Sequence, residues 1–136
     1  MNSYGLIDLH CDTLAEYWKY AHTGNPDTLD DPGRVLSLSN MPKDVHWAQF
    51  YAVFIPDEER GQAAIDYFEK NRANFYRQME KFGDRVAPCR NADDMEKAWA
   101  AGKTAAFLTI ENGSALAGDL SRVHTLAEQG VRAITL

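Results

Sequence analysis

The segment LIDLHCDT, residues 6 to 13, places a histidine and an aspartate two positions apart at the end of an apolar run. Side chains at i and i+2 of a strand point to one face with Cα atoms about 6.6 Å apart, so His10 and Asp12 could bind one ion. Imidazole nitrogen and carboxylate oxygen suit zinc or a similar divalent metal. The alternative is that His10 is a satisfied core residue and Asp12 caps a helix.

A third candidate ligand, Glu111, stands at the end of another apolar run, in LTIENG at residues 108 to 113. If both runs are strands of one parallel sheet, all three residues lie on the same rim, because active residues gather at the carboxyl ends of parallel strands. Glu111 can equally be a turn residue before Asn112 and Gly113. The coincidence of three such residues on one rim strengthens the case for a metal site and leaves the structural alternative open.

Three neighbouring residues bear on this site. Asp8 shares the face of His10 by the same spacing, where it can orient the imidazole as a hydrogen-bond acceptor or pair with a polar group of an adjacent strand. Cys11 faces the other way and is expected to be a small buried packing residue. Gln49 interrupts an apolar strand, which predicts that its amide forms hydrogen bonds inside the protein.

The other histidines are poorly placed for metal binding. His22 is at a polar junction, His46 is at the start of a predicted strand, and His124 lies within a predicted helix. Without them the chain offers one nitrogen and two carboxylates, fewer donors than the four of a closed zinc site.

The elements that must position these residues alternate along the chain. Apolar runs of strand length occupy residues 4–11, 46–55, 104–111 and 131–136. Segments of helical period lie at 13 to about 21, 60–82, 91–101 and 116–127, and residues 23–44 form a long irregular connection. The order βαβαβαβ and the continuous apolar character of the strands predict an α/β fold of parallel βα units in one domain over 1–136.

The predicted helices carry capping and striping signals. Thr13 and Glu16 have the spacing of a capping box, Asn91 can cap the third helix, and Gly102 and Gly130 can end the third and fourth. Apolar residues at helical spacing form one stripe at Ile65, Phe68, Phe75, Met79 and Phe82 and another at Leu116, Leu120, Val123 and Ala127.

Composition excludes several partners. The 14 basic and 20 acidic residues give a net charge of −6 without a basic run, which argues against nucleic acid and anionic membrane surfaces. The longest apolar stretches fall far short of the roughly 20 residues that span a bilayer, and the N-terminus lacks a secretory pattern. Cys11 and Cys89 are too few for a disulfide framework. We expect a soluble cytoplasmic protein that acts on small molecules or neutral peptides.

Four ordered segments carry a family resemblance: IDLHCDT, NMPKDVHWAQFYAVFIP, AGKTAAFLTIENGSAL and LAEQGVRAITL. Together they resemble the first strand, the second strand with its approach, the third strand and the next helix and strand of the membrane (renal) dipeptidase family. Its members are zinc-dependent hydrolases with a TIM-barrel fold related to the amidohydrolases. The resemblance covers essentially all 136 residues and implies the N-terminal part of a (β/α)8 barrel.

The resemblance also implies a role for each candidate ligand. His10 and Asp12 would bind one zinc ion, and Glu111 would bridge it to a second. A water activated by the two ions would hydrolyse the peptide bond of a dipeptide, often one with a D-residue at its C-terminal position. Leu9 and Asn112 stand where glycine is common in relatives, and Asn112 is expected to reshape the floor of the pocket.

The remaining site residues of the family lie beyond the point that Leu136 matches. They are two histidines for the second zinc, a histidine that polarises the substrate and an acid/base aspartate. We therefore expect the chain to be an incomplete portion of a longer enzyme, inactive alone, with a homodimer as a further expectation. Two alternatives are an amidohydrolase-type enzyme acting on lactones or cyclic amides, and a non-catalytic barrel fragment that serves as a binding module.

Overall fold

The computed structural model describes residues 4–15 and 28–136 of the chain. Its sheet contains β1 (Gly5–Cys11), β2 (His46–Phe54), β3 (Val86–Pro88), β4 (Thr104–Glu111) and β5 (Val131–Thr135). Its helices are α2 (Gln62–Lys81), α3 (Ala92–Ala100) and α4 (Arg122–Glu128), with 3-10 turns η2 (Thr28–Asp30) and η3 (Gly113–Leu116). Every strand pairing is parallel, which confirms the predicted fold class.

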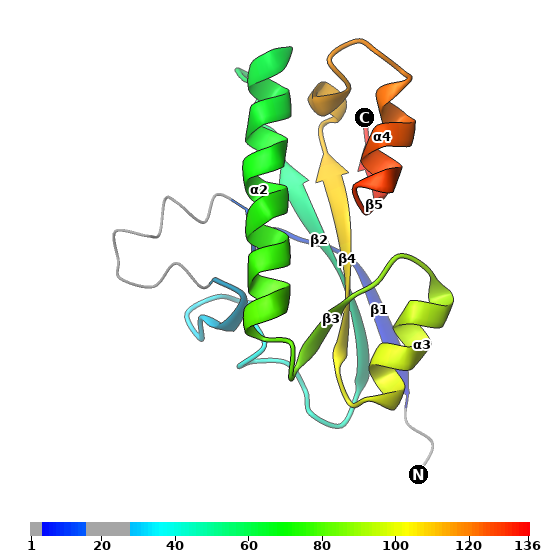
Figure 1. The fold of residues 1–136 in the computed structure, drawn as a ribbon. Coiled ribbons are helices and arrows are strands. Elements are labelled where there is room, and N and C mark those ends of the chain that lie inside the picture. Colours follow the sequence, from blue (N-terminus) through cyan, green and yellow to red (C-terminus); the bar gives the residue numbers. More distant parts are fainter. Residues whose placement is uncertain (1–3, 16–27) are drawn as a thin grey trace.

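The strand order places β1 next to β2 and β2 next to β4 (Figure 1). The other edge of β4 is shared: β3 pairs with its first residues, 104–106, and β5 pairs with its last, 108–111. The four predicted strands are all present. The prediction missed β3, because a strand of three residues is too short to show a pattern. It also ends in a proline, which has no N–H to donate.

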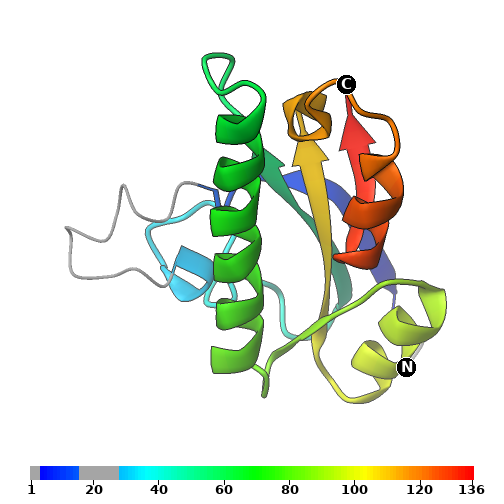
Figure 2. The same ribbon diagram turned by 45° about the horizontal axis from the view of Figure 1, so that its top comes forward.

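The two faces of the sheet pack against different helices. Figure 2 shows α2 and α4 on the same side of the sheet, over a cluster that includes Tyr51 and Leu108. The alternate strand residues Ala48 and Phe107 belong to a second cluster with Ala98 of α3. Both faces of the central strands are therefore buried, which explains their continuous apolar sequence. Within the described residues, no helix combines the length and the hydrophobicity needed to cross a bilayer.

The long connection between β1 and β2 is anchored by polar residues of α2. Gln78 accepts a hydrogen bond from the Leu29 backbone N–H through Oε1 at 2.8 Å, and Asn74 donates from Nδ2 to the Leu14 carbonyl at 3.3 Å. The two amides also contact each other, and both are buried. These side chains satisfy backbone groups of a connection that has no strand partner. The buried face of α2 therefore includes polar residues, which a search for apolar periodicity does not detect.

The helix predicted from residue 13 is described only at its start. Residues 13–15 form a turn in which the Thr13 hydroxyl donates to the Leu36 carbonyl at 2.6 Å. The rest of that predicted helix, with Glu16 of the capping box, lies outside the described residues.

The stripe predicted for the last helix was wrong in part, although Leu116 is buried as predicted. Leu120 is 79% exposed and Val123 is 46% exposed, whereas Leu126, outside the predicted stripe, is fully buried. The physical reason is a break in the chain: Ala117 and Gly118 have φ of 50° and 78°, so the 3-10 turn η3 and the helix α4 do not share one helical register. In contrast, Asn91 caps α3 as predicted, accepting a hydrogen bond from the Asp94 N–H at 2.8 Å.

Gly130 has a φ of 105° at the turn from α4 to β5, and a Cβ there would overlap the Tyr76 hydroxyl. That hydroxyl donates to the Gln129 carbonyl at 3.0 Å. We expect Gly130→Ala to lower the free energy of unfolding by about 2–3 kcal/mol, since it strains the backbone and breaks this hydrogen bond. The control Gly102→Ala, at φ 71° with open space around the Cβ, should lose only about 1 kcal/mol. Denaturant unfolding measures both, and equal losses would contradict the role of Tyr76.

Candidate metal centre

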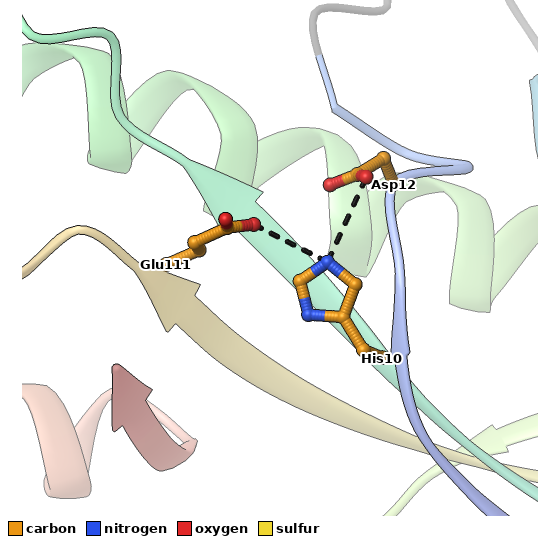
Figure 3. A group of neighbouring side chains, drawn as sticks. All are labelled: His10, Asp12 and Glu111. Carbon is orange, nitrogen blue, oxygen red and sulfur yellow. Dashed lines mark ion pairs between the residues drawn. The ribbon is translucent and has the colours of Figure 1, made fainter. Parts of the chain in front are cut away.

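Three side chains, from β1, from the residue that follows it and from the end of β4, converge at one end of the sheet. His10 Nε2 lies 3.2 Å from Glu111 Oε2 and 3.6 Å from Asp12 Oδ2, and one ligand atom from each residue lies within 4.8 Å of the other two. Figure 3 shows His10 and Asp12 on the chain of β1 pointing toward Glu111 at the end of β4. The structure thus brings together all three residues that the sequence analysis selected as candidate ligands.

The position of Glu111 follows from the pairing of β2 with β4. The register runs without interruption from Ala48 opposite Ala105 to Phe54 opposite Glu111. Because side chains alternate along a strand, Glu111 continues the face that carries Phe107. Its carboxylate is therefore held at the carboxyl end of the buried central pair of strands, on the face opposite to α2.

The position of His10 depends on an irregularity in β1. Three steps along β1, from Asp8 to Cys11, oppose two steps along β2, from Gln49 to Tyr51, so β1 contains one extra residue. Such a bulge re-aims the side chains that follow it. The Asp8 carboxylate accepts a hydrogen bond from the His10 backbone N–H through Oδ1 at 3.1 Å, within this bulge.

The bulge changes the interpretation of Asp8. Asp8 and His10 would share a face by their i, i+2 spacing only in a regular strand, and strict alternation does not hold across the extra residue. In the structure the Asp8 carboxylate accepts its hydrogen bond from the backbone N–H of His10. A supporting role for Asp8 at the site stays a prediction, now through the backbone.

Cys11 and Gln49, which lie beside the candidate ligands in β1 and β2, have structural roles. Cys11 packs against the cluster on the α2 face, and burial raises the pKa of its thiol to about 11. Gln49 is fully buried, donates to the carbonyls of Asp8 and Phe50, and accepts a hydrogen bond from Trp47 Nε1 at 3.0 Å. The prediction of an internally bonded glutamine is confirmed, and Cys11 packs as predicted but is only partly buried.

The three candidate ligands are open to solvent. Their side chains are 48% exposed for His10, 60% for Asp12 and 37% for Glu111. A protonated His10 between two carboxylates would form ion pairs with the same distances, and at this exposure such a pair stabilises a protein by only about 0–1 kcal/mol. Stability alone therefore gives little reason to gather these three groups here.

The geometry fits a shared divalent ion. Two donors that each lie about 2.1 Å from one tetrahedral ion are about 3.4 Å apart. The separations of 3.2 and 3.6 Å from His10 Nε2 to the two carboxylates bracket this value. One imidazole and two carboxylates suit zinc or a similar metal, and three protein donors leave positions open for water, substrate or further ligands.

The other histidines lie elsewhere or outside the description. His46 packs its ring against Trp99, with centroids 5.5 Å apart, at the start of β2 and so away from the rim. His124 pairs with Glu128 on α4 at 3.2 Å. His22 lies outside the described residues. For His46 and His124 the structure agrees with the sequence-based exclusion.

Sequence reasoning noticed Asn112 but missed its contacts. Asn112 has a φ of 69° and donates from Nδ2 to the Ile55 carbonyl at 2.8 Å and to Asp57 Oδ1 at 3.1 Å. Its Oδ1 accepts from the backbone N–H and the hydroxyl of Ser114. The only local signal was an asparagine before a glycine at the end of a strand, which is typical of a left-handed backbone but does not identify distant partners.

Solved structures resemble the chain closely in fold. A dipeptidase AC, described as a family M19 metallopeptidase, superposes with a TM-score of 0.78 at 19% identity, with 98% of this chain and 42% of that chain covered. A metallopeptidase from Rhodobacter sphaeroides, liganded with a phosphinate mimic of the dipeptide L-Ala-D-Ala, gives 0.78 at 17% identity, with 98% and 45% covered. The probable dipeptidase PvdM from Pseudomonas aeruginosa gives 0.68 at 20%, with 94% and 33% covered.

These identities establish the fold alone, and this chain spans less than half the length of each of the three structures. The fold is the one predicted, because the parallel sheet matches the N-terminal part of the TIM-barrel-like fold of these dipeptidases. No curated protein sequence matches the chain. Family membership comes from the sequence itself, in which residues 1–136 match the pattern of the membrane dipeptidases. The chain belongs to the membrane dipeptidase family, peptidase family M19.

Proposed function

We propose that this protein is a metal-dependent dipeptidase whose metal site is formed in part by His10, Asp12 and Glu111. The observation that carries the proposal is the meeting of these three donors within 4.8 Å at the carboxyl rim of a parallel sheet. In this fold that rim is where catalytic groups gather. Membership of a metallopeptidase family supports a metal ion, rather than a proton on His10, as the species that joins them.

In this proposal His10 and Asp12 would bind one Zn²⁺, and Glu111 would bind it together with a second. A carboxylate has two oxygens, and Glu111 directs Oε2 toward His10 Nε2, which leaves Oε1 as a donor for another ion. The chain would form the N-terminal portion, over 1–136, of a single barrel domain. The other ligands of the second ion and the acid/base group would come from later strands of that barrel.

The chemistry of such a site is hydrolysis. When bound, the two ions supply a water of lowered pKa as nucleophile and an electrophile that polarises the scissile carbonyl. The chain's own residues set the conditions for this. Asp12 and Glu111 offset the positive charge of the ions, and His10 binds in its neutral form, so all three donors must be deprotonated. Asp8 would support the site by holding the backbone of His10.

The proposed substrate is a dipeptide. The support is the Rhodobacter sphaeroides metallopeptidase of similar fold, which is liganded with a phosphinate mimic of L-Ala-D-Ala. A reducing compartment such as the cytoplasm suits the two free thiols, Cys11 and Cys89. A homodimer is a further proposal, which follows from the family resemblance alone.

The first test removes the bridging carboxylate. We expect Glu111→Gln in the intact protein to reduce kcat/KM for dipeptides by on the order of a thousandfold, or about 4 kcal/mol of transition-state stabilisation, while the fold is kept. Glu128→Gln on α4, where the side chain is 69% exposed, is the matched control and should leave turnover unchanged. Steady-state kinetics and circular dichroism measure the two effects. Near-normal turnover of Glu111→Gln at saturating zinc would refute the assignment.

The second test removes the nitrogen ligand. His10→Ala should lose about one metal ion per chain, because an alanine offers no donor and the remaining carboxylates hold the ion weakly. His124→Ala, at a histidine that is 84% exposed on α4, should retain the metal content of the unaltered protein. Elemental analysis of the purified proteins gives the stoichiometry. If His10→Ala keeps its full metal content, His10 is structural.

A further inference from the structure

Asn112 links the strand that ends in Glu111 to the end of the neighbouring strand. The last backbone hydrogen bond between these segments runs from the Ile55 N–H to the Glu111 carbonyl at 3.1 Å. After Glu111 the chain turns into η3, so the backbone cannot form the next bond of the ladder. The Asn112 side chain forms it instead, donating from Nδ2 to the Ile55 carbonyl at 2.8 Å.

The same side chain closes a ring of four polar residues, which we call the Asn112 ring. Asn112 Nδ2 donates to Asp57 Oδ1 at 3.1 Å, and Asp57 Oδ1 lies 3.6 Å from Arg60 Nη2. Arg60 Nη1 donates to Ser114 Oγ at 2.8 Å, and the Ser114 hydroxyl donates to Asn112 Oδ1 at 2.7 Å. The ring joins the loop that follows β2 to the loop that follows β4.

The backbone at Asn112 has a positive φ, a conformation that glycine would adopt with less strain. Asn112 has a φ of 69°, in the left-handed region that favours glycine, and a non-glycine residue there costs about 1 kcal/mol. Asparagine is among the residues that best tolerate this conformation. The four hydrogen bonds formed by its amide offset the cost.

The ring also keeps the electrostatics of the rim unchanged. Asp57 and Arg60 carry opposite charges and face each other, so the ring adds no net charge beside Asp12 and Glu111. Its effect on a cation at the rim is therefore through geometry. A partner that fixes the orientation of a ligand without touching the ion commonly affects metal affinity.

We propose that Asn112 is a positioning residue, which fixes the backbone of Glu111 and thereby aims its carboxylate at the ion shared with His10 and Asp12. This rests on the proposed metal site. Two hydrogen bonds hold the end of β4 to Ile55: the Glu111 carbonyl accepts from the Ile55 N–H, and the Asn112 amide donates to the Ile55 carbonyl. Loss of the bond from Asn112 to Ile55 would leave the backbone at Glu111 free to rotate.

The test compares two asparagine-to-glycine variants of the intact protein. Asn112→Gly removes the ring and relieves the positive φ, so its unfolding midpoint should change little. The matched control Asn91→Gly removes the helix cap of α3, which costs only a few tenths of a kcal/mol. Zn²⁺ affinity of the metal-free proteins is measured by competition with a chromophoric chelator at 25 °C. We expect the dissociation constant to rise about tenfold or more for Asn112→Gly and to stay unchanged for Asn91→Gly.

A third variant keeps the proposal testable if Asn112→Gly does not fold. Ser114→Ala removes only the hydroxyl that joins Arg60 to Asn112, and should raise the dissociation constant for Zn²⁺ by about threefold. An unchanged Zn²⁺ affinity in both Asn112→Gly and Ser114→Ala would overturn the positioning role of Asn112 without contradicting the metal site. If the unaltered protein binds no Zn²⁺, the proposed function itself fails, so the two failures are distinguishable.

Discussion

The candidate site depends on one constraint, the parallel register of β1, β2 and β4. The uninterrupted pairing of β2 with β4 places Glu111 opposite Phe54, at the end of the ladder. The adjacent pairing of β1 with β2 brings His10 and Asp12 to the same end. Because parallel strands all finish at one edge, donors separated by about a hundred residues of sequence come to lie within a few ångströms.

The rim is organised by polar contacts and the body of the sheet by apolar packing. Tyr51 and Leu108 lie under α2, and Ala48 and Phe107 pack with α3, so the central strands are buried on both faces. The rim is solvent-exposed, and local hydrogen bonds run beside it, from the His10 backbone N–H to Asp8 and from the Asn112 amide to the Ile55 carbonyl. A stable core therefore supports an open site whose own ion pairs stabilise the fold little.

The grouping of His10, Asp12 and Glu111 is not explained by the small contribution of their ion pairs to stability. Exposed ion pairs contribute little, yet the distances from His10 Nε2 to its two carboxylates match donors around a common ion. The bulge in β1 and the positive φ of Asn112 are departures from regular structure beside these residues. Such departures are typical of functional sites, where the surrounding contacts offset the cost of unusual backbone conformations.

Much of this arrangement was determined by the sequence alone. The apolar runs and the end positions of His10, Asp12 and Glu111 predicted the parallel sheet and the rim, because side-chain alternation and strand length are local properties. The cap at Asn91 was predicted for the same reason. Only the tertiary structure decided the bulge that separates Asp8 from the face of His10, and the start of α4 at Arg122. It also decided the bond from Asn112 to Ile55, 57 residues away. These features depend on which distant segments pair and in what register, and local patterns of residue type do not encode that pairing.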